Sequence, residues 1–133
     1  MSDVLDGLVT VGGRRVAYCL YGAGGRHRTL FQYGTPGVRW LSPQLIAAAS
    51  RAEAALLVID HPGYGGSSRR PARRVVDVLD EVAAVLAAVG WQRCAVWGGS
   101  GGGPHALALA ARLPDRSTDA PAWWGCPHRT HPG

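Results

Sequence analysis

Apolar positions along the chain fall into short runs separated by glycine-rich turns, a pattern that predicts strands alternating with helices. Two of the runs flank the pair Gly12-Gly13, a two-residue turn signal that favours an antiparallel hairpin. The predicted strands are residues 8–11, 16–21, 29–33, 55–59 and 94–97. Residues 55–59 are continuously apolar, which is typical of a strand covered on both faces.

Three helices are predicted between and after these strands. Ser42 and Pro43 supply an N-cap and a first-turn proline for a helix over residues 43–51. From Val75 to Val89 apolar residues recur at spacings of three and four, and Gly90 then ends that helix as a C′ residue. An alanine- and leucine-rich pattern predicts the third helix over residues 104–113. The fold class is therefore α/β, with an N-terminal hairpin leading into a mostly parallel sheet flanked by helices.

The chain has 133 residues, enough for one domain. We assign residues 1–116 to that domain. Residues 117–133 carry prolines and no strand or helix period, and they are expected to form an irregular, disordered tail. A parallel sheet with no later strand leaves its last strand as an edge, so self-association through that exposed edge is a possible interaction.

Charge narrows the classes of function. The net charge is +5, and all 14 basic residues are arginine. Without lysine the chain can form neither a P-loop nor a Schiff base. The densest basic run, Arg69, Arg70, Arg73 and Arg74, is interpreted as a solvated loop, because no aromatic residue accompanies it between residues 67 and 89. No nucleic-acid partner is expected.

No segment of the sequence has the length of apolar residues that a membrane span requires, and Asp3 and Asp6 interrupt the first eleven residues, where a signal peptide would be apolar. The three cysteines, Cys19, Cys94 and Cys126, are odd in number and far apart, which favours a reducing compartment. We expect a cytoplasmic protein with no membrane partner. Cys126, His128 and His131 could be read as metal ligands, but three donors in a flexible, proline-rich tail make a weak case, so neither a metal nor a cofactor is expected.

Residues 98–102 read Gly-Gly-Ser-Gly-Gly, which is G-x-S-x-G between a predicted strand and a predicted helix. A serine on so tight a turn has a strained backbone, so the residues two before and two after it must be small. Gly98 and Gly102 meet that requirement. The turn exposes the Ser100 hydroxyl at the carboxyl end of the sheet, and the backbone N–H of Gly101 becomes a natural oxyanion donor.

With this turn, three motifs in order resemble those of the α/β-hydrolase superfamily, over roughly residues 8–116. Residues 33–37, Tyr-Gly-Thr-Pro-Gly, resemble the His-Gly-x-Pro oxyanion loop with tyrosine in place of histidine. Residues 60–67 resemble the D-x-P-G-x-G-x-S loop, and residues 98–102 resemble the nucleophile elbow, with a typical helix sequence continuing to residue 116. The resemblance implies a serine hydrolase that cleaves an ester- or amide-type acyl bond of a small molecule.

The same resemblance implies roles for single residues. Ser100 is the expected nucleophile, and the N–H groups of Thr35, beside Gly34, and of Gly101 are the expected oxyanion hole. His61 and His105 match positions with structural roles, and Asp60 is expected to organise its loop. Of the tryptophans, Trp91 and Trp97 are expected in the core, while Trp40 fits either the core or an acyl pocket.

In the family the triad acid and histidine follow the serine by well over a hundred residues, whereas 33 residues follow Ser100 here. We therefore expect a truncated domain, inactive or impaired, whose triad acid and base are unknown. The remaining candidates, Asp119, His128 and His131, have no predicted strand to hold them near Ser100.

Two functions of other classes stay open. One is a nucleotide-binding module with residues 99–103 as a phosphate cradle, although Pro104 stands where G-x-G-x-x-G needs its third glycine. The other is a non-catalytic interaction protein that pairs through the open sheet edge. Serine at the elbow excludes the usual epoxide hydrolases and dehalogenases, which use an aspartate nucleophile.

Overall fold

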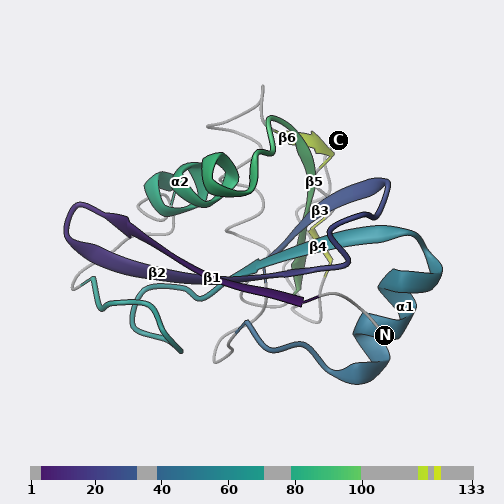
Figure 1. Ribbon diagram of the computed structural model, residues 1–133, viewed down its shortest axis with the longest axis horizontal. Helices are drawn as coiled ribbons and strands as arrows, with labels where there is room; N and C mark the ends of the chain where they lie inside the picture. The colour runs from purple at the N-terminus through teal and green to yellow at the C-terminus, as the bar shows by residue number, and fades with distance from the viewer. Residues whose placement is uncertain (1–3, 33–38, 71–78, 100–116, 120–121, 124–133) are drawn as a thin grey trace.

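The structure is a computed structural model that describes residues 4–32, 39–70, 79–99, 117–119 and 122–123 (Figure 1). The predicted helix over residues 104–113 and the first turns of the helix predicted from Val75 lie outside the described residues. The elements, in chain order, are β1 (Val4–Val11), β2 (Arg14–Tyr21), β3 (His27–Gln32), α1 (Pro43–Arg51), β4 (Ala54–Ile59), α2 (Leu79–Val89), β5 (Cys94–Gly99), β6 (Ser117–Asp119) and β7 (Ala122–Trp123).

The described strands form one mixed sheet in the order β1-β2-β4-β3-β5-β6, with β7 also paired to β5. β1 and β2 are antiparallel to each other, and β2 is antiparallel to β4. β3 runs parallel to both β4 and β5. The predicted α/β class, with a hairpin leading into a mostly parallel sheet, is confirmed.

The hairpin begins earlier than the pattern predicted, because Val4 and Leu5 already pair with Tyr21 and Leu20. Its turn follows the sequence signal closely. Gly12 and Gly13 have φ angles of 54° and 76°, the left-handed region that a two-residue turn between twisted strands requires.

The sheet has an apolar cluster on each face. Alternate residues of β2 supply them, with Tyr18 in the larger cluster and Cys19 in the smaller one. Figure 1 shows α2 above the sheet and α1 below it. Val85 of α2 is fully buried in the larger cluster, while Ile46 of α1 packs against the smaller one. The two helices therefore cover opposite faces, as the continuously apolar strands predict.

Both predicted helix ends are confirmed. The Ser42 hydroxyl accepts a hydrogen bond from the Leu45 N–H at 3.2 Å, so it caps α1. At the end of α2, Gly90 has φ of 75°, its N–H donates to Ala87, and the next N–H donates to Leu86. This pair of bonds is the Schellman motif, which ends a helix on a left-handed residue.

One acidic residue of α2 is buried. Glu81 is 2% exposed and forms ion pairs with Arg14 at the start of β2 and with Arg70 in the loop before the helix. Its bond to Arg70 is 3.2 Å long. Arg70 is therefore not a purely solvated residue, as the basic run had suggested, whereas Arg69 is exposed.

β6 and β7 fall within residues 117–133, for which the pattern predicted no strand. Both run parallel to β5, β6 beside its beginning and β7 beside its end. β5, which was expected to be an open edge of the sheet, is therefore paired with β6 and β7 in the described part of the chain. The division into a domain ending at residue 116 and a tail stays a prediction. Among the described helices, none is long and apolar enough to cross a membrane.

Candidate active site

Three neighbouring strands end on the same side of the sheet. β3, β4 and β5 are parallel neighbours, so their carboxyl ends lie together. They end at Gln32, Ile59 and Gly99, and each of the three sequence motifs follows one of these ends or overlaps it by two residues. Gln32 and Gly98 are direct partners across the β3–β5 pair. The edge where open α/β sheets bind ligands therefore carries all three motifs.

Most of the predicted catalytic groups lie just past the described strands. Ser100, Gly101 and Gly102 are outside the described residues, as are Gly34 and Thr35. Gly98 is described and forms part of β5, which continues through Gly99 to the residue before Ser100. The predicted strand, which ended at Trp97, is thus two residues too short.

Asp60 organises the loop after β4, as predicted. Its side chain is fully buried, and its carboxylate accepts three hydrogen bonds. The N–H of Gly66, in the same loop, donates at 2.9 Å. The other two come from Arg39, through its backbone N–H at 2.5 Å and its guanidinium Nη1 at 2.6 Å. Asp60 therefore joins its own loop to the chain that follows residues 33–38.

Ser67 fixes the far end of the same loop against β2. Its hydroxyl donates to the Asp60 carbonyl at 2.7 Å and accepts from the Ala17 N–H at 3.0 Å. Between them Gly65 has φ of 52°, and a Cβ on it would lie 2.1 Å from the Asp60 carboxylate. The Gly and Ser positions of this motif are thus required by the turn around Asp60.

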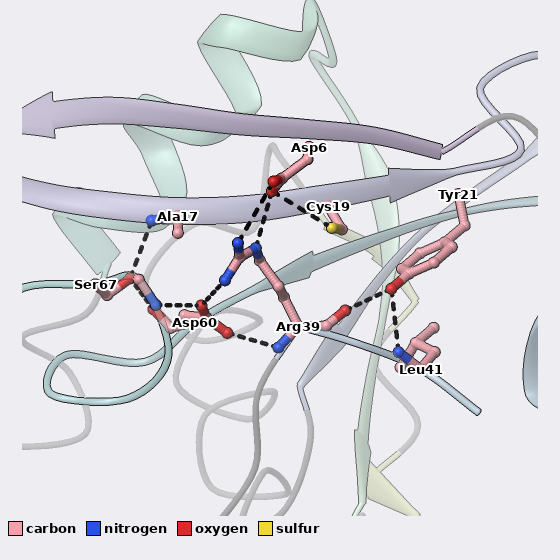
Figure 2. A network of polar contacts seen from close by, with 9 residues as sticks. Asp6, Ala17, Cys19, Tyr21, Arg39, Leu41, Asp60 and Ser67 are labelled. Atoms are coloured by element: carbon pink, nitrogen blue, oxygen red, sulfur yellow. Dashed lines mark hydrogen bonds and ion pairs between the residues drawn. The ribbon is translucent and has the colours of Figure 1, made fainter.

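Arg39 is the residue that the sequence analysis missed. Figure 2 shows its guanidinium between Asp6 of β1 and Asp60. Nε donates to Asp6 at 2.9 Å while Nη1 reaches Asp60 on the other side. The hydrogen bond to Asp6, together with that to Asp60, raises the pKa of Arg39 further above its already high ordinary value, although burial opposes the shift. In turn the Arg39 hydrogen bond lowers the pKa of Asp6.

The backbone around Arg39 is held by Tyr21 at the end of β2. The Tyr21 hydroxyl donates to the Arg39 carbonyl at 2.7 Å and accepts from the Leu41 N–H at 3.1 Å (Figure 2). Burial of this hydroxyl raises the pKa of Tyr21. Trp40, between the two, is 55% exposed, so it is not a core residue, and the Arg39 guanidinium lies 4.5 Å from its ring centroid.

The remaining candidates lie away from this edge or outside the described residues. Asp119 lies opposite Ala95, near the beginning of β5. Ala95 is four residues before Gly99, where the strand ends, and at ~3.3 Å per residue the two positions are about 13 Å apart along the strand. His61 is buried, in keeping with a structural role. His105, Cys126, His128 and His131 lie outside the described residues.

The two tryptophans expected in the core differ. Trp91 is 3% exposed and packs in the larger cluster, with the Arg28 guanidinium 5.7 Å from its ring centroid. Trp97 is 41% exposed, so its assignment to the core was wrong. In a strand side chains alternate between faces, so Trp97 points to the face opposite that of buried Val96.

Comparisons with known proteins agree with this arrangement. A family model described as the alpha/beta hydrolase fold matches residues 30–117. A predicted CIB-like hydrolase from Thermoplasma acidophilum has a similar structure, with a TM-score of 0.75 and 21% identity over 92% of this chain and 65% of that one. The thioesterase domain from the curacin biosynthetic pathway gives a TM-score of 0.76 and 17% identity, over 89% and 43%.

An epoxide hydrolase from an endophytic Streptomyces gives a TM-score of 0.73 and 27% identity, over 86% of this chain and 35% of that one. The chain thus spans less than two thirds of each of these three proteins. A search of curated proteins finds no match.

Proposed function

Because the chain belongs to the alpha/beta hydrolase fold family, we propose that it is hydrolase machinery in which Ser100 attacks an ester- or amide-type acyl bond. The proposed substrate is a small molecule with such a bond. The proposed oxyanion hole is the pair of N–H groups of Thr35 and Gly101.

The pairing of Gln32 with Gly98 is the observation that carries this proposal. Thr35 is three residues past Gln32, and Gly101 is three residues past Gly98, directly after Ser100. Neighbouring strands are ~4.8 Å apart and three residues extend at most ~10 Å, so both groups start from adjacent points of one edge. An oxyanion hole needs such an origin, because its two donors must lie about 3 Å from one oxygen.

The chemistry follows from these roles. The Ser100 oxygen attacks the carbonyl carbon as its proton passes to a general base, and the two N–H groups stabilise the negative charge on the carbonyl oxygen. Collapse of the tetrahedral intermediate expels the leaving group and leaves an acyl ester on Ser100, which water hydrolyses. The position of Asp119 beside Ala95 does not favour it as the triad acid. His128 and His131 are the candidates for the base.

The residue at the elbow separates this proposal from epoxide opening, the chemistry named for the Streptomyces relative. Aspartate nucleophiles form an alkyl ester with the epoxide carbon, which is then cleaved at its carbonyl. A serine would instead form an ether with that carbon, and water does not readily cleave an ether. Serine at position 100 therefore supports an acyl substrate.

The proposal also covers the cellular location of the chain and its partners. Cys19 keeps its thiol in a buried position, which supports a cytoplasmic location. Arg70 is engaged by Glu81, which lessens the case for a nucleic-acid surface in the basic run. Self-association through an exposed sheet edge stays part of the proposal, and because β6 and β7 pair with β5, these short strands form the edge on that side of the described sheet.

The test is labelling of the purified chain with a fluorophosphonate probe, beside turnover of p-nitrophenyl acetate. Because the chain is expected to be impaired, we expect weak labelling and weak turnover. The label should map to Ser100, and both signals should disappear in Ser100→Ala. Ser50→Ala is the matched control, because Ser50 is an exposed serine on α1. It should behave as wild type.

Single substitutions His128→Gln and His131→Gln then identify the base. The correct one should lose ~10²-fold or more of the turnover while circular dichroism stays unchanged. Equal turnover in wild type and Ser100→Ala, with both proteins folded, would refute the proposed nucleophile.

A further inference from the structure

We infer that Arg39 is a positioning residue, which joins the chain directly after residues 33–38 to β1, to β2 and to Asp60 at the end of β4, and so sets the position of the proposed oxyanion donor of Thr35. The catalytic consequence rests on the proposed function. The fixation itself rests on contacts of described residues and can be tested separately.

The side chain of Arg39 joins two carboxylates that come from distant parts of the sequence. Its side chain is 13% exposed and lies between Asp60, fully buried, and Asp6, which is half exposed. The distances are 2.6 Å to Asp60 and 2.9 Å to Asp6. A planar guanidinium can donate in both directions at once, whereas a lysine ammonium is a single point charge. The residue type thus suits a connection between β1 and the end of β4.

The backbone of Arg39 is fixed independently of its side chain. Its N–H donates to Asp60 at 2.5 Å, and its carbonyl accepts from Tyr21 at 2.7 Å. Leu41, two residues on, donates its N–H to the same Tyr21 hydroxyl at 3.1 Å. Residue 39 is therefore held on both its peptide groups and on its side chain, by groups from β1, β2 and the end of β4.

The position of Arg39 in the sequence, directly after residues 33–38, relates these bonds to the proposed oxyanion hole. β3 ends at Gln32, and the next described residue is Arg39. The chain is thus fixed on both sides of residues 33–38, by the β-ladder before them and by Arg39 after them. Thr35 is four residues before Arg39. An oxyanion donor that is misplaced by about 1 Å loses much of its effect, so a loose end at residue 39 would weaken the transition state more than the ground state.

Two variants test the fixation by hydrogen exchange. Arg39→Gln removes the guanidinium, and Tyr21→Phe removes the hydroxyl while leaving both carboxylate contacts intact. In each variant, the amide to follow is one that forms no hydrogen bond with the substituted side chain, because only coupled opening of the backbone can then change its exchange rate. We expect the Leu41 amide to exchange about tenfold faster in Arg39→Gln, and the Arg39 amide about tenfold faster in Tyr21→Phe, as coupled local opening predicts.

Arg26→Gln is the matched control. It removes an exposed ion pair with Glu53 at 2.6 Å, located at the opposite end of β3, and it should leave both amides unchanged. Amides in the centre of β4 should keep wild-type exchange in all three variants, which shows that the sheet is intact. Unchanged exchange of Leu41 in Arg39→Gln would overturn the inference, since Arg39 would then not determine the position of the backbone.

The catalytic role is tested by fluorophosphonate labelling, in which the probe affinity and the inactivation rate constant are measured separately. We expect the inactivation rate constant to fall about tenfold in Arg39→Gln and in Tyr21→Phe, with probe affinity within about twofold of wild type. A structural loss alone would lower the amount of labelled protein and leave its rate unchanged. An unchanged rate constant beside faster amide exchange would overturn the positioning role. No labelling of wild type would refute the proposed nucleophile, while the amides would still decide whether Arg39 fixes the segment.

Discussion

Glu81→Gln is the substitution with the clearest expected effect on stability. Glu81 is 2% exposed in the first turn of α2, and its carboxylate faces the guanidinium groups of Arg14 and Arg70. Glutamine has nearly the same size and shape, so the change removes the charge without opening a cavity. It leaves two arginines, with side chains 23% and 28% exposed, beside a neutral amide.

The magnitude follows from how much water those arginines can reach. Breaking a fully buried ion pair costs ~3–5 kcal/mol. Arg14 and Arg70 each keep about a quarter of their exposure and can turn partly toward solvent, which lowers the cost. We expect a loss of about 2 kcal/mol in the free energy of unfolding. For a domain with ~5–15 kcal/mol in all, such a loss is readily measured.

The assay is urea unfolding followed by circular dichroism and by tryptophan fluorescence, with Asp80→Asn as the control. Asp80 precedes Glu81 on α2 but is exposed, so its variant loses the same charge without breaking a buried ion pair. That loss should cost about 0.5 kcal/mol or less. If the two variants have the same midpoint and slope, the buried pair does not stabilise α2 against the hairpin and the reasoning is refuted.

Two other substitutions follow from the same contacts. Gly65→Ala should destabilise the chain by more than Gly12→Ala in urea unfolding, since both have positive φ but only at Gly65 would the Cβ meet the Asp60 carboxylate, at 2.1 Å. Gly12→Ala isolates the conformational cost, about 1 kcal/mol, and equal losses would contradict the close approach. Asp6→Asn tests a pH dependence. Arg39 lowers the pKa of Asp6 in the folded chain, so the stabilisation is present above the ordinary value of 3.8 and is lost as the pH falls below it. Wild type should therefore be more stable than Asp6→Asn at pH 7, and a difference that persisted unchanged at pH 2 would argue against this ion pair.

Local signals in the sequence predicted local structure well. Gly12-Gly13 predicted the hairpin turn, and Ser42 and Gly90 predicted helix ends that the structure confirms. Each depends on the φ preference or capping ability of residues at the site itself. The same holds for Asp60, whose role was expected from its motif and whose carboxylate accepts the N–H of Gly66 six residues later.

Contacts between distant residues could not be predicted in this way. Nothing beside Arg39 in the sequence marks Asp6, 33 residues earlier, as its partner, because only the pairing of β1 with β2 brings them together. Glu81 lay among other acids of its helix, and the arginine 67 residues away that pairs with it gave no periodic signal. β6 and β7 were missed for a related reason. Segments of three and two residues are too short to show a period, and their pairing with β5 defines them.

The order of the strands explains why the Asp60 carboxylate accepts hydrogen bonds from two separate segments of the chain. β3 lies between β4 and β5, and where the described chain resumes after β3, at Arg39, it contacts Asp60 at the end of β4. Asp60 follows β4 directly, and its two carboxylate oxygens accept from residue 39 and from residue 66. A neutral side chain there would leave the Arg39 guanidinium with Asp6 alone, on the more exposed side. The buried acid is therefore the group on which the geometry of both loops depends, and the glycine at position 65 is the condition for the loop to close around it.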